Sequence, residues 1–96
     1  MSDKALYQQK KEVEIAIWKS EILKLKAKAS MASADAQIEL NKSIDALEKK
    51  IDEGKVKLSD LIKATDDMYE SMKNEVESSW NSMKTAFSDI ASKFRN

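Results

Sequence analysis

Lysines and carboxylates are the abundant side chains of this chain that could do chemistry, because its 96 residues include no histidine and no cysteine. The common general base, the thiol nucleophile and the ligands that zinc prefers are therefore missing. The adjacent pair Asp66 and Asp67 could contact a divalent cation, but nothing around it has the spacing of a calcium loop. Gly54 is the only glycine, so there is no glycine-rich phosphate loop. We predict that the protein is not an enzyme and has no catalytic, cofactor-binding or metal-binding residues.

The charge balance argues against nucleic acid as a partner. The chain has 17 basic and 17 acidic residues and a pI near 6.3, whereas a protein that neutralises phosphates carries an excess of basic residues. No segment approaches the roughly 18 consecutive apolar residues that a membrane span requires. The polar N-terminus contains no signal-peptide core. We expect a single helical domain over residues 1–96, located in the cytoplasm.

The elements that carry these side chains are predicted to be long helices. The chain has no proline, one glycine and 35% charged residues, which is the composition of a long or coiled helix. From Ile15 onward, apolar residues recur at steps of three and four, which places them on one side of a helix. Each half of the chain carries one such stripe, and the two stripes can be paired in reverse order about Gly54. The first stripe is 15, 18, 22, 25, 29, 32, 36, 40, 44, 47 and 51, and its partners in order are 94, 90, 87, 83, 80, 76, 72, 69, 65, 62 and 58.

This reversed match predicts an all-α fold, a long antiparallel two-helix coiled-coil hairpin that turns near Gly54. Helix 1 would span about residues 3–53 and helix 2 about residues 56–95. Glycine is favoured just after the last residue of a helix, where the backbone becomes left-handed. The alternative is one continuous helix that pairs antiparallel with a second copy, because an interior glycine costs a helix only about 1 kcal/mol.

Two groups of polar residues are candidates for capping these helices. Ser2 or Asp3 can accept a backbone N–H at the start of helix 1, and Ser59 or Asp60 can do the same for helix 2.

The only run of alanines in the first stripe lies opposite large side chains in the second. The predicted pairs are Ala29 with Trp80, Ala32 with Val76 and Ala36 with Met72. Large side chains that face small ones let two helices approach closely and still fill the space between them.

A second apolar stripe marks a candidate surface for partners. Phe94 pairs with Ile15 in the hairpin, which leaves residues 1–14 without an intramolecular partner. The residues of this second stripe are Leu6, Val13, Ile17, Met31 and Ile38. We interpret them as partner-binding residues, either for another protein or for a second copy, as a swapped dimer or a dimer of hairpins that forms a four-helix bundle. The alternative interpretation is scattered surface apolar residues, which are common on any protein.

The last predicted helix could also contact a membrane surface. One face carries Trp80, Met83, Phe87, Ile90 and Phe94, and the opposite face is mostly Ser, Thr and Asn. An amphipathic helix of this kind can lie in a membrane interface. The same residues also form the predicted core, which is the interpretation we prefer.

The order of motifs resembles a family of short bacterial coiled-coil proteins, which are described either as stress-response proteins or without a function. The resemblance rests on IWKSEILKLKAKASMASADAQIEL (17–40) and ATDDMYESMKNEVESSWNSMKTAFSDIASKF (64–94), with Trp18 and Trp80 as their landmarks. It implies a small, soluble, cytoplasmic helical protein that is associated with stress, and it carries no active site to this chain.

Three functions remain open at this point. The first is a structural or interaction module, associated with stress, that acts through self-association or protein partners. The second is a helix bundle that opens reversibly on a membrane or lipid surface. The third is a chaperone-like binder of apolar segments.

Overall fold

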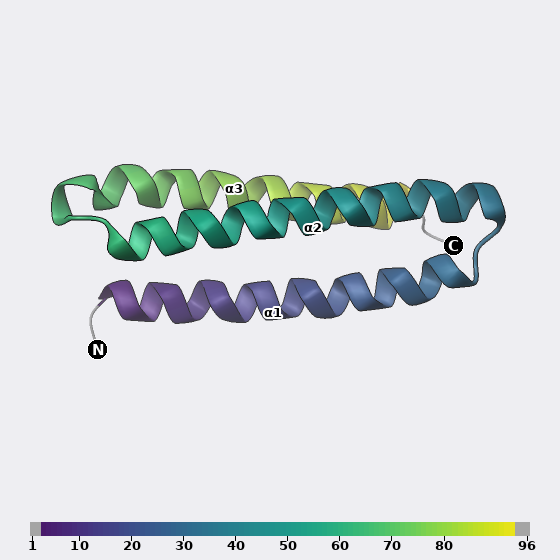
Figure 1. Cartoon of the computed structure of the whole chain (residues 1–96), viewed down its shortest axis with the longest axis horizontal. Coiled ribbons are helices and arrows are strands. Elements are labelled where there is room, and N and C mark those ends of the chain that lie inside the picture. The colour runs from purple at the N-terminus through teal and green to yellow at the C-terminus, as the bar shows by residue number, and fades with distance from the viewer. Residues whose placement is uncertain (1–2, 94–96) are drawn as a thin grey trace.

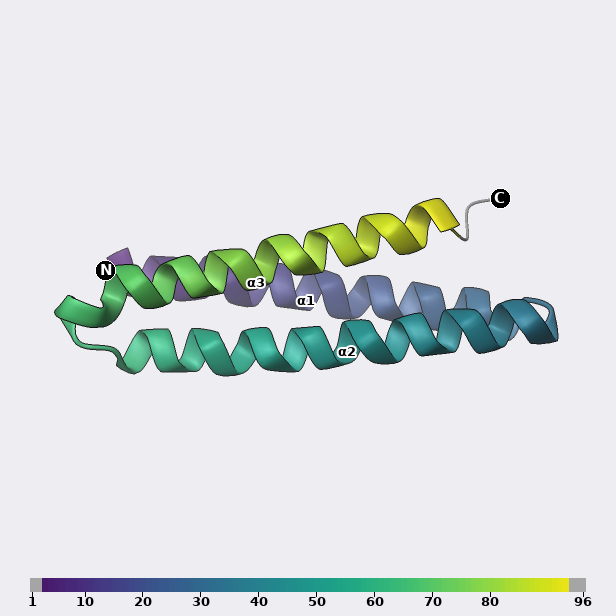
Figure 2. The ribbon, with the colours of Figure 1, turned by 90° about the horizontal axis from the view of Figure 1, so that it is seen from above.

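The computed structural model describes residues 3–93, which form three helices in a single elongated bundle of 51 × 21 × 18 Å. The helices are α1 (Asp3–Ser30), α2 (Ala34–Lys63) and α3 (Asp66–Lys93). α2 runs antiparallel to both of its neighbours, so α1 and α3 run in the same direction (Figures 1 and 2). The all-α prediction is confirmed.

The predicted turn at Gly54 is wrong. α2 continues through this residue, and no glycine has a positive φ. The predicted boundaries at residues 53 and 56 therefore fall inside α2, and so do Ser59 and Asp60, which cap nothing there. The alternative of one continuous helix is also wrong for this chain, because its helices end at Ser30 and at Lys63.

The first connection forms because serines compete for the backbone there. Ser30 Oγ donates a hydrogen bond of 2.7 Å to the carbonyl of Ala27. Ser33 is the N-cap of α2: its backbone is extended, and its side chain accepts from the N–H of Ala36 at 3.4 Å. Asp35 follows in the first turn, where a negative charge favours the positive end of the helix dipole. A polar cap, without any glycine, is sufficient to start a new helix.

The second connection is two residues long and equally free of glycine. Ala64 is extended (φ −68°, ψ 149°), and its N–H bonds to the carbonyl of Leu61 at 3.1 Å. The N–H of Met68 bonds to the carbonyl of Thr65 at 3.1 Å, and Asp66 and Asp67 occupy the first turn of α3.

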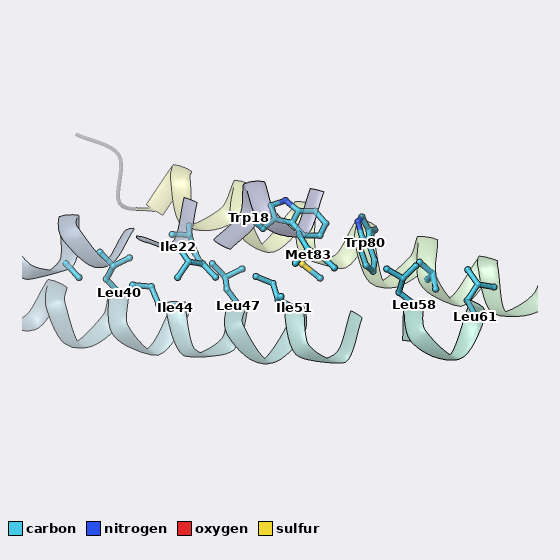
Figure 3. Close-up of a cluster of buried hydrophobic side chains, with 14 residues drawn as sticks. Trp18, Ile22, Leu40, Ile44, Leu47, Ile51, Leu58, Leu61, Trp80 and Met83 are labelled. Carbon is cyan, nitrogen blue, oxygen red and sulfur yellow. The ribbon is translucent and has the colours of Figure 1, made fainter. Parts of the chain in front are cut away.

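The core consists of one apolar stripe from each helix (Figure 3). All of its residues but Leu61 belong to the predicted stripes. In that turn of α2 Leu61 is fully buried and the predicted Ile62 is only half-buried. The buried apolar residues are Ile15, Trp18, Ile22, Ala29, Leu40, Ile44, Leu47, Ile51, Leu58, Leu61, Val76, Trp80, Met83 and Ile90.

The residue that gives Trp80 room is Gly54, not an alanine. A Cβ placed on Gly54 would lie 3.0 Å from Cζ3 of Trp80 and 3.2 Å from Cε of Met83. The indole of Trp80 therefore rests directly on the bare backbone of α2. The predicted pairing of Trp80 with Ala29 is wrong, because the alanine run straddles the first connection instead of facing α3.

Large side chains span the gap between α1 and α3. Within residues 3–93, no Cα of α1 lies within 8 Å of a Cα of α3. The ring centroids of Trp18 and Trp80 are 5.5 Å apart, and Trp18 also stacks on Phe87 at 6.1 Å. These aromatic pairs prefer offset or tilted contacts at such distances, so they fill the wider seam of the bundle. Phe94, which was predicted to face Ile15, lies outside the described residues.

Candidate functional site

The outer face of α1 carries three of the predicted partner-binding residues side by side. Leu6, Val13 and Ile17 are 49%, 59% and 55% exposed. Spacings of seven and four residues place them on one stripe. The core residues Ile15 and Trp18 occupy the opposite side of the helix.

The other two predicted residues lie elsewhere. Met31 is in the first connection and Ile38 is on the second turn of α2, and both are exposed. They stand at the end of the bundle where α1 finishes, whereas Leu6 stands where α1 begins (Figure 1). The structure therefore does not join Met31 and Ile38 with Leu6 into one continuous surface.

The predicted overhang of residues 1–14 is wrong for the described part, because the start of α1 packs against the other two helices. Lys4 Nζ donates to the carbonyl of Ala64 at 2.8 Å, which satisfies the end of α2. Tyr7 Oη donates to Glu77 Oε2 at 2.7 Å. Lys11 Nζ lies 2.7 Å from the same carboxylate oxygen.

Lys11 is the centre of a polar cluster between α1 and α3 that the sequence analysis did not single out. It is 5% exposed, although lysine is rarely buried without a partner. Besides Glu77, its ammonium lies 3.4 Å from Glu14 Oε1. It also stands 5.2 Å from the ring centre of Trp80 and 5.3 Å from that of Tyr7, within reach of a cation–π attraction. Lys11 could have been found, because it precedes Ile15 by four residues and so continues the core stripe.

The electrostatics of the cluster follow from these contacts. The hydrogen bond from Lys11 holds the pKa of the Glu77 carboxyl below its usual value, and the bond from Tyr7 acts in the same direction. Burial and the bond to Glu77 raise the pKa of Tyr7. Glu77 is therefore an anion held between two donors. The cluster is a closed set of ion pairs that fixes the register of α1 against α3.

Two buried polar atoms at this seam lack a hydrogen bond within the described chain. They are Nε1 of Trp80 and Oε1 of Glu14, which lies 3.4 Å from Lys11 Nζ as an ion pair.

A groove of about 340 Å³ runs between α1 and α2. Its floor is aliphatic, with Ile22 and Ile51, and its rims carry both signs of charge. Lys26 and Glu48 approach to 3.4 Å across it. This ion pair bridges the groove, which Lys19 and Asp52 also line.

The charges of the chain are distributed unevenly among the helices. α1 has seven lysines and four acidic residues, a net charge of +3, whereas α3 has three lysines and six acidic residues, a net charge of −3. The outer face of α3 is polar and includes the exposed acidic residues Asp67, Glu70 and Asp89. Its exposed uncharged residues at steps of three and four are Ser71, Asn74, Ser78, Asn81, Thr85 and Ser88.

Within residues 3–93, no group of three or more His, Cys, Asp or Glu side chains is arranged to hold a metal ion. None of the three helices has a segment long and apolar enough to cross a membrane.

Comparison with family models, curated proteins and solved structures gave no match for this chain. The resemblance to bacterial coiled-coil proteins therefore stays a prediction.

Proposed function

We propose that this protein is a non-enzymatic interaction module that binds through the outer face of α1, with α2 and α3 as its support. The support is the continuous core that joins all three helices. The binding face is the stripe of Leu6, Val13 and Ile17.

The observation that carries the proposal is the clustering of this stripe. On the outside of α2, Ile38 and Val56 are also exposed, but 18 residues separate them, or about 27 Å along the helix. The outside of α3 carries mainly hydroxyl, amide and acidic side chains, and Met68 is its one exposed large apolar residue within the described chain. Removing apolar surface from water is favourable by roughly 25 cal/mol per Å², so a partner that covers adjacent exposed apolar residues gains binding free energy.

The burial pattern disfavours the function that requires an open bundle. Trp80 and Met83, the residues that would enter a lipid interface from the last helix, are almost fully buried in the core. A bundle that opens on lipid would have to break this core before binding, whereas the face of α1 is exposed in the closed bundle.

The test replaces one of two valines at a time by a photo-crosslinking residue and compares the cross-linked products that form in the cells of origin. Val13 on α1 and Val56 on α2 are equally exposed, at 59% and 60%. We expect defined products from position 13 that disappear when Leu6 and Ile17 are changed to Glu, and no such products from position 56. Equal products from both positions, or products that survive the Glu changes, would contradict the proposal.

Mass in solution then tells whether a second copy occupies the face. One chain has a mass of 10.9 kDa. A larger mass that returns to that of one chain in the Leu6→Glu, Ile17→Glu variant would identify self-association through α1. If both the original protein and the variant have the mass of one chain, the face binds a partner other than a second copy.

The association with stress that the family resemblance implies is part of this proposal. We expect the products from position 13 to increase in stressed cells at equal protein abundance. Products that do not change under heat, salt or oxidant would remove the stress association and leave the binding face intact.

A further inference from the structure

The face of α1 that carries the apolar stripe also carries three lysines. At about 100° per residue, positions 6, 10, 13, 17, 24 and 28 fall within about 60° of one another around the helix. Lys10, Lys24 and Lys28 are therefore on the same side as Leu6, Val13 and Ile17, and all six are exposed. We call these six residues the lysine–aliphatic face.

The composition of this face is unlike that of a protein–protein interface. Such interfaces are enriched in aromatic residues and arginine and depleted of lysine. The lysine–aliphatic face has neither aromatic residues nor arginine. Lysines act on an anionic lipid surface as separate positive charges that need no fixed geometry, and their methylene stems can lie along apolar groups.

The acidic residues of α1 cancel these charges only in part, because two of the four, Asp3 and Glu21, stand at the edge of the face and the other two are turned away from it. Glu14 is turned toward Lys11, and Glu12 lines a groove against α2. Glu21 stands at the edge of the face, where its Oε1 is 3.4 Å from Lys24 Nζ. Lys10 and Lys28 have no ion-pair partner among the described residues.

The whole molecule is polarised in the same sense. α1 has a net charge of +3 and α3 a net charge of −3. An anionic surface attracts the first helix and repels the third, so it orients the bundle with α1 toward itself. α1 has 28 residues, or about 42 Å, and so presents most of the 51 Å length of the bundle to a flat surface.

We propose that the lysine–aliphatic face docks the closed bundle on an anionic lipid bilayer, with the axis of α1 parallel to the surface. This inference rests on the proposed function and names the partner of the same face. The aliphatic side chains enter the headgroup region, the lysines contact the anionic lipids, and Trp18 and Trp80 stay in the core. It differs from a bundle that opens on lipid, because no buried residue is exposed.

The absence of cysteine in the sequence allows a clean experiment. Val13→Cys and its matched control Val56→Cys are each labelled with an environment-sensitive fluorophore and titrated with two kinds of vesicle. One is phosphatidylcholine alone and the other contains phosphatidylserine. We expect a blue shift at position 13 with phosphatidylserine vesicles, reversed by 0.5 M salt because of screening, and little change at position 56 or with phosphatidylcholine. Tryptophan emission should stay constant.

A charge-reversal pair supplies the second measurement. Changing Lys10, Lys24 and Lys28 to Glu should weaken vesicle binding by more than about a hundredfold, since each lysine near an anionic surface contributes roughly fivefold and the three glutamates add repulsion. The control changes three exposed lysines of α2, Lys42, Lys49 and Lys63, in the same way. Circular dichroism verifies that both variants keep their helices.

Several results would overturn the inference. They are the absence of a shift at position 13, equal shifts at both positions, equal loss in the two charge variants, or a change in tryptophan emission, which would mean that the bundle opens. An acidic amphipathic peptide is the parallel probe. If it shifts the signal at position 13 and vesicles do not, the partner is a protein helix. Position-specific cross-links without vesicle binding would likewise leave the proposed function standing and remove only the lipid.

Discussion

α1 and α3 have 28 residues each, run in the same direction and pack on the same helix, yet their outer faces have little in common. α3 presents serines, asparagines, a threonine and acidic residues to solvent, while α1 presents Leu6, Val13 and Ile17 among lysines. The inner faces differ too: the buried residues of α3 are all apolar, whereas α1 adds the buried Lys11 to its apolar core residues. With an apolar stripe outside and a lysine inside, α1 fits its fold less well than its neighbour does. Such a departure from the needs of folding is expected where a helix also has a function.

The largest expected effect comes from the side chain that ties α3 to both other helices. Trp80→Ala removes the contacts with Trp18 and Gly54 and leaves a cavity, so we expect a loss of about 3–5 kcal/mol in the free energy of unfolding. Urea denaturation followed by circular dichroism measures it. Phe87→Ala, at a partly buried position of the same helix, should cost less. If the two variants unfold alike, the seam does not depend on Trp80.

Lys11 tests the inner side of α1. Lys11→Ala removes the ion pairs with Glu77 and Glu14 and the packing of the lysine stem, and we expect a loss of about 2 kcal/mol. Lys11→Met keeps the stem and should cost less. In the background of Glu14→Gln and Glu77→Gln, Lys11→Met should become neutral or stabilising, because no carboxylate is then left without its partner. An unchanged cost in that background would mean that Lys11 acts by packing alone.

Gly54 decides how closely α3 approaches α2. Alanine is better than glycine in a helix by about 1 kcal/mol, but its Cβ would stand 3.0 Å from a buried indole. Overpacking of this kind typically costs about 1–3 kcal/mol, so we expect Gly54→Ala to destabilise by about 1 kcal/mol. In a Trp80→Phe background the ring atoms nearest Gly54 are gone, and the same change should stabilise. A gain from Gly54→Ala with Trp80 intact would show that the contact is loose.

The same glycine shows where prediction from the sequence succeeds and where it fails. The spacing of apolar residues is a property of each helix, and every buried apolar residue except Leu61 lies on a predicted stripe. The same stripes also ran through Ala32 and Thr65, which lie in the two connections. Reversed pairing about one point, in contrast, is a property of any two stripes with steps of three and four. It carried no information about where the chain turns. The real turns depend on Ser33, the N-cap of α2, and on acidic residues in the first turns of α2 and α3. The prediction overlooked both signals because it placed the turn at the single glycine.

The candidate face was predictable for a related reason. Leu6, Val13 and Ile17 stand out because they fall on the side of the helix opposite the core stripe, which needs no tertiary structure to see. Their separation from Met31 and Ile38 depends on where α1 ends. The burial of Lys11 depends on which helix lies beside it, because lysine is polar by type and only its neighbours make it internal.

Acid should weaken the seam between α1 and α3 through Glu77. Its pKa is lowered in the folded state from an ordinary value of 4.5, so its contribution to stability is complete above that value. The contribution is lost as the pH falls from about 5 through the folded-state pKa. Because the Glu77 side chain is 48% exposed, the effect is at most about 1 kcal/mol. Glu77→Gln should flatten the pH dependence of urea unfolding in this range, and Glu75→Gln on the same helix should not.

The smallest effect on stability is expected on the outer face of α1. A small effect there would indicate that these residues serve binding and not folding. Val13→Glu replaces a side chain that is 59% exposed, so the free energy of unfolding should change by no more than about 0.5 kcal/mol. The same substitution puts a negative charge between Lys10 and Ile17 and should abolish binding to phosphatidylserine vesicles. Val56→Glu on α2 should leave both quantities unchanged. If Val13→Glu instead unfolds the bundle, the valine supports the fold, and the contrast between α1 and α3 would then concern stability, not binding.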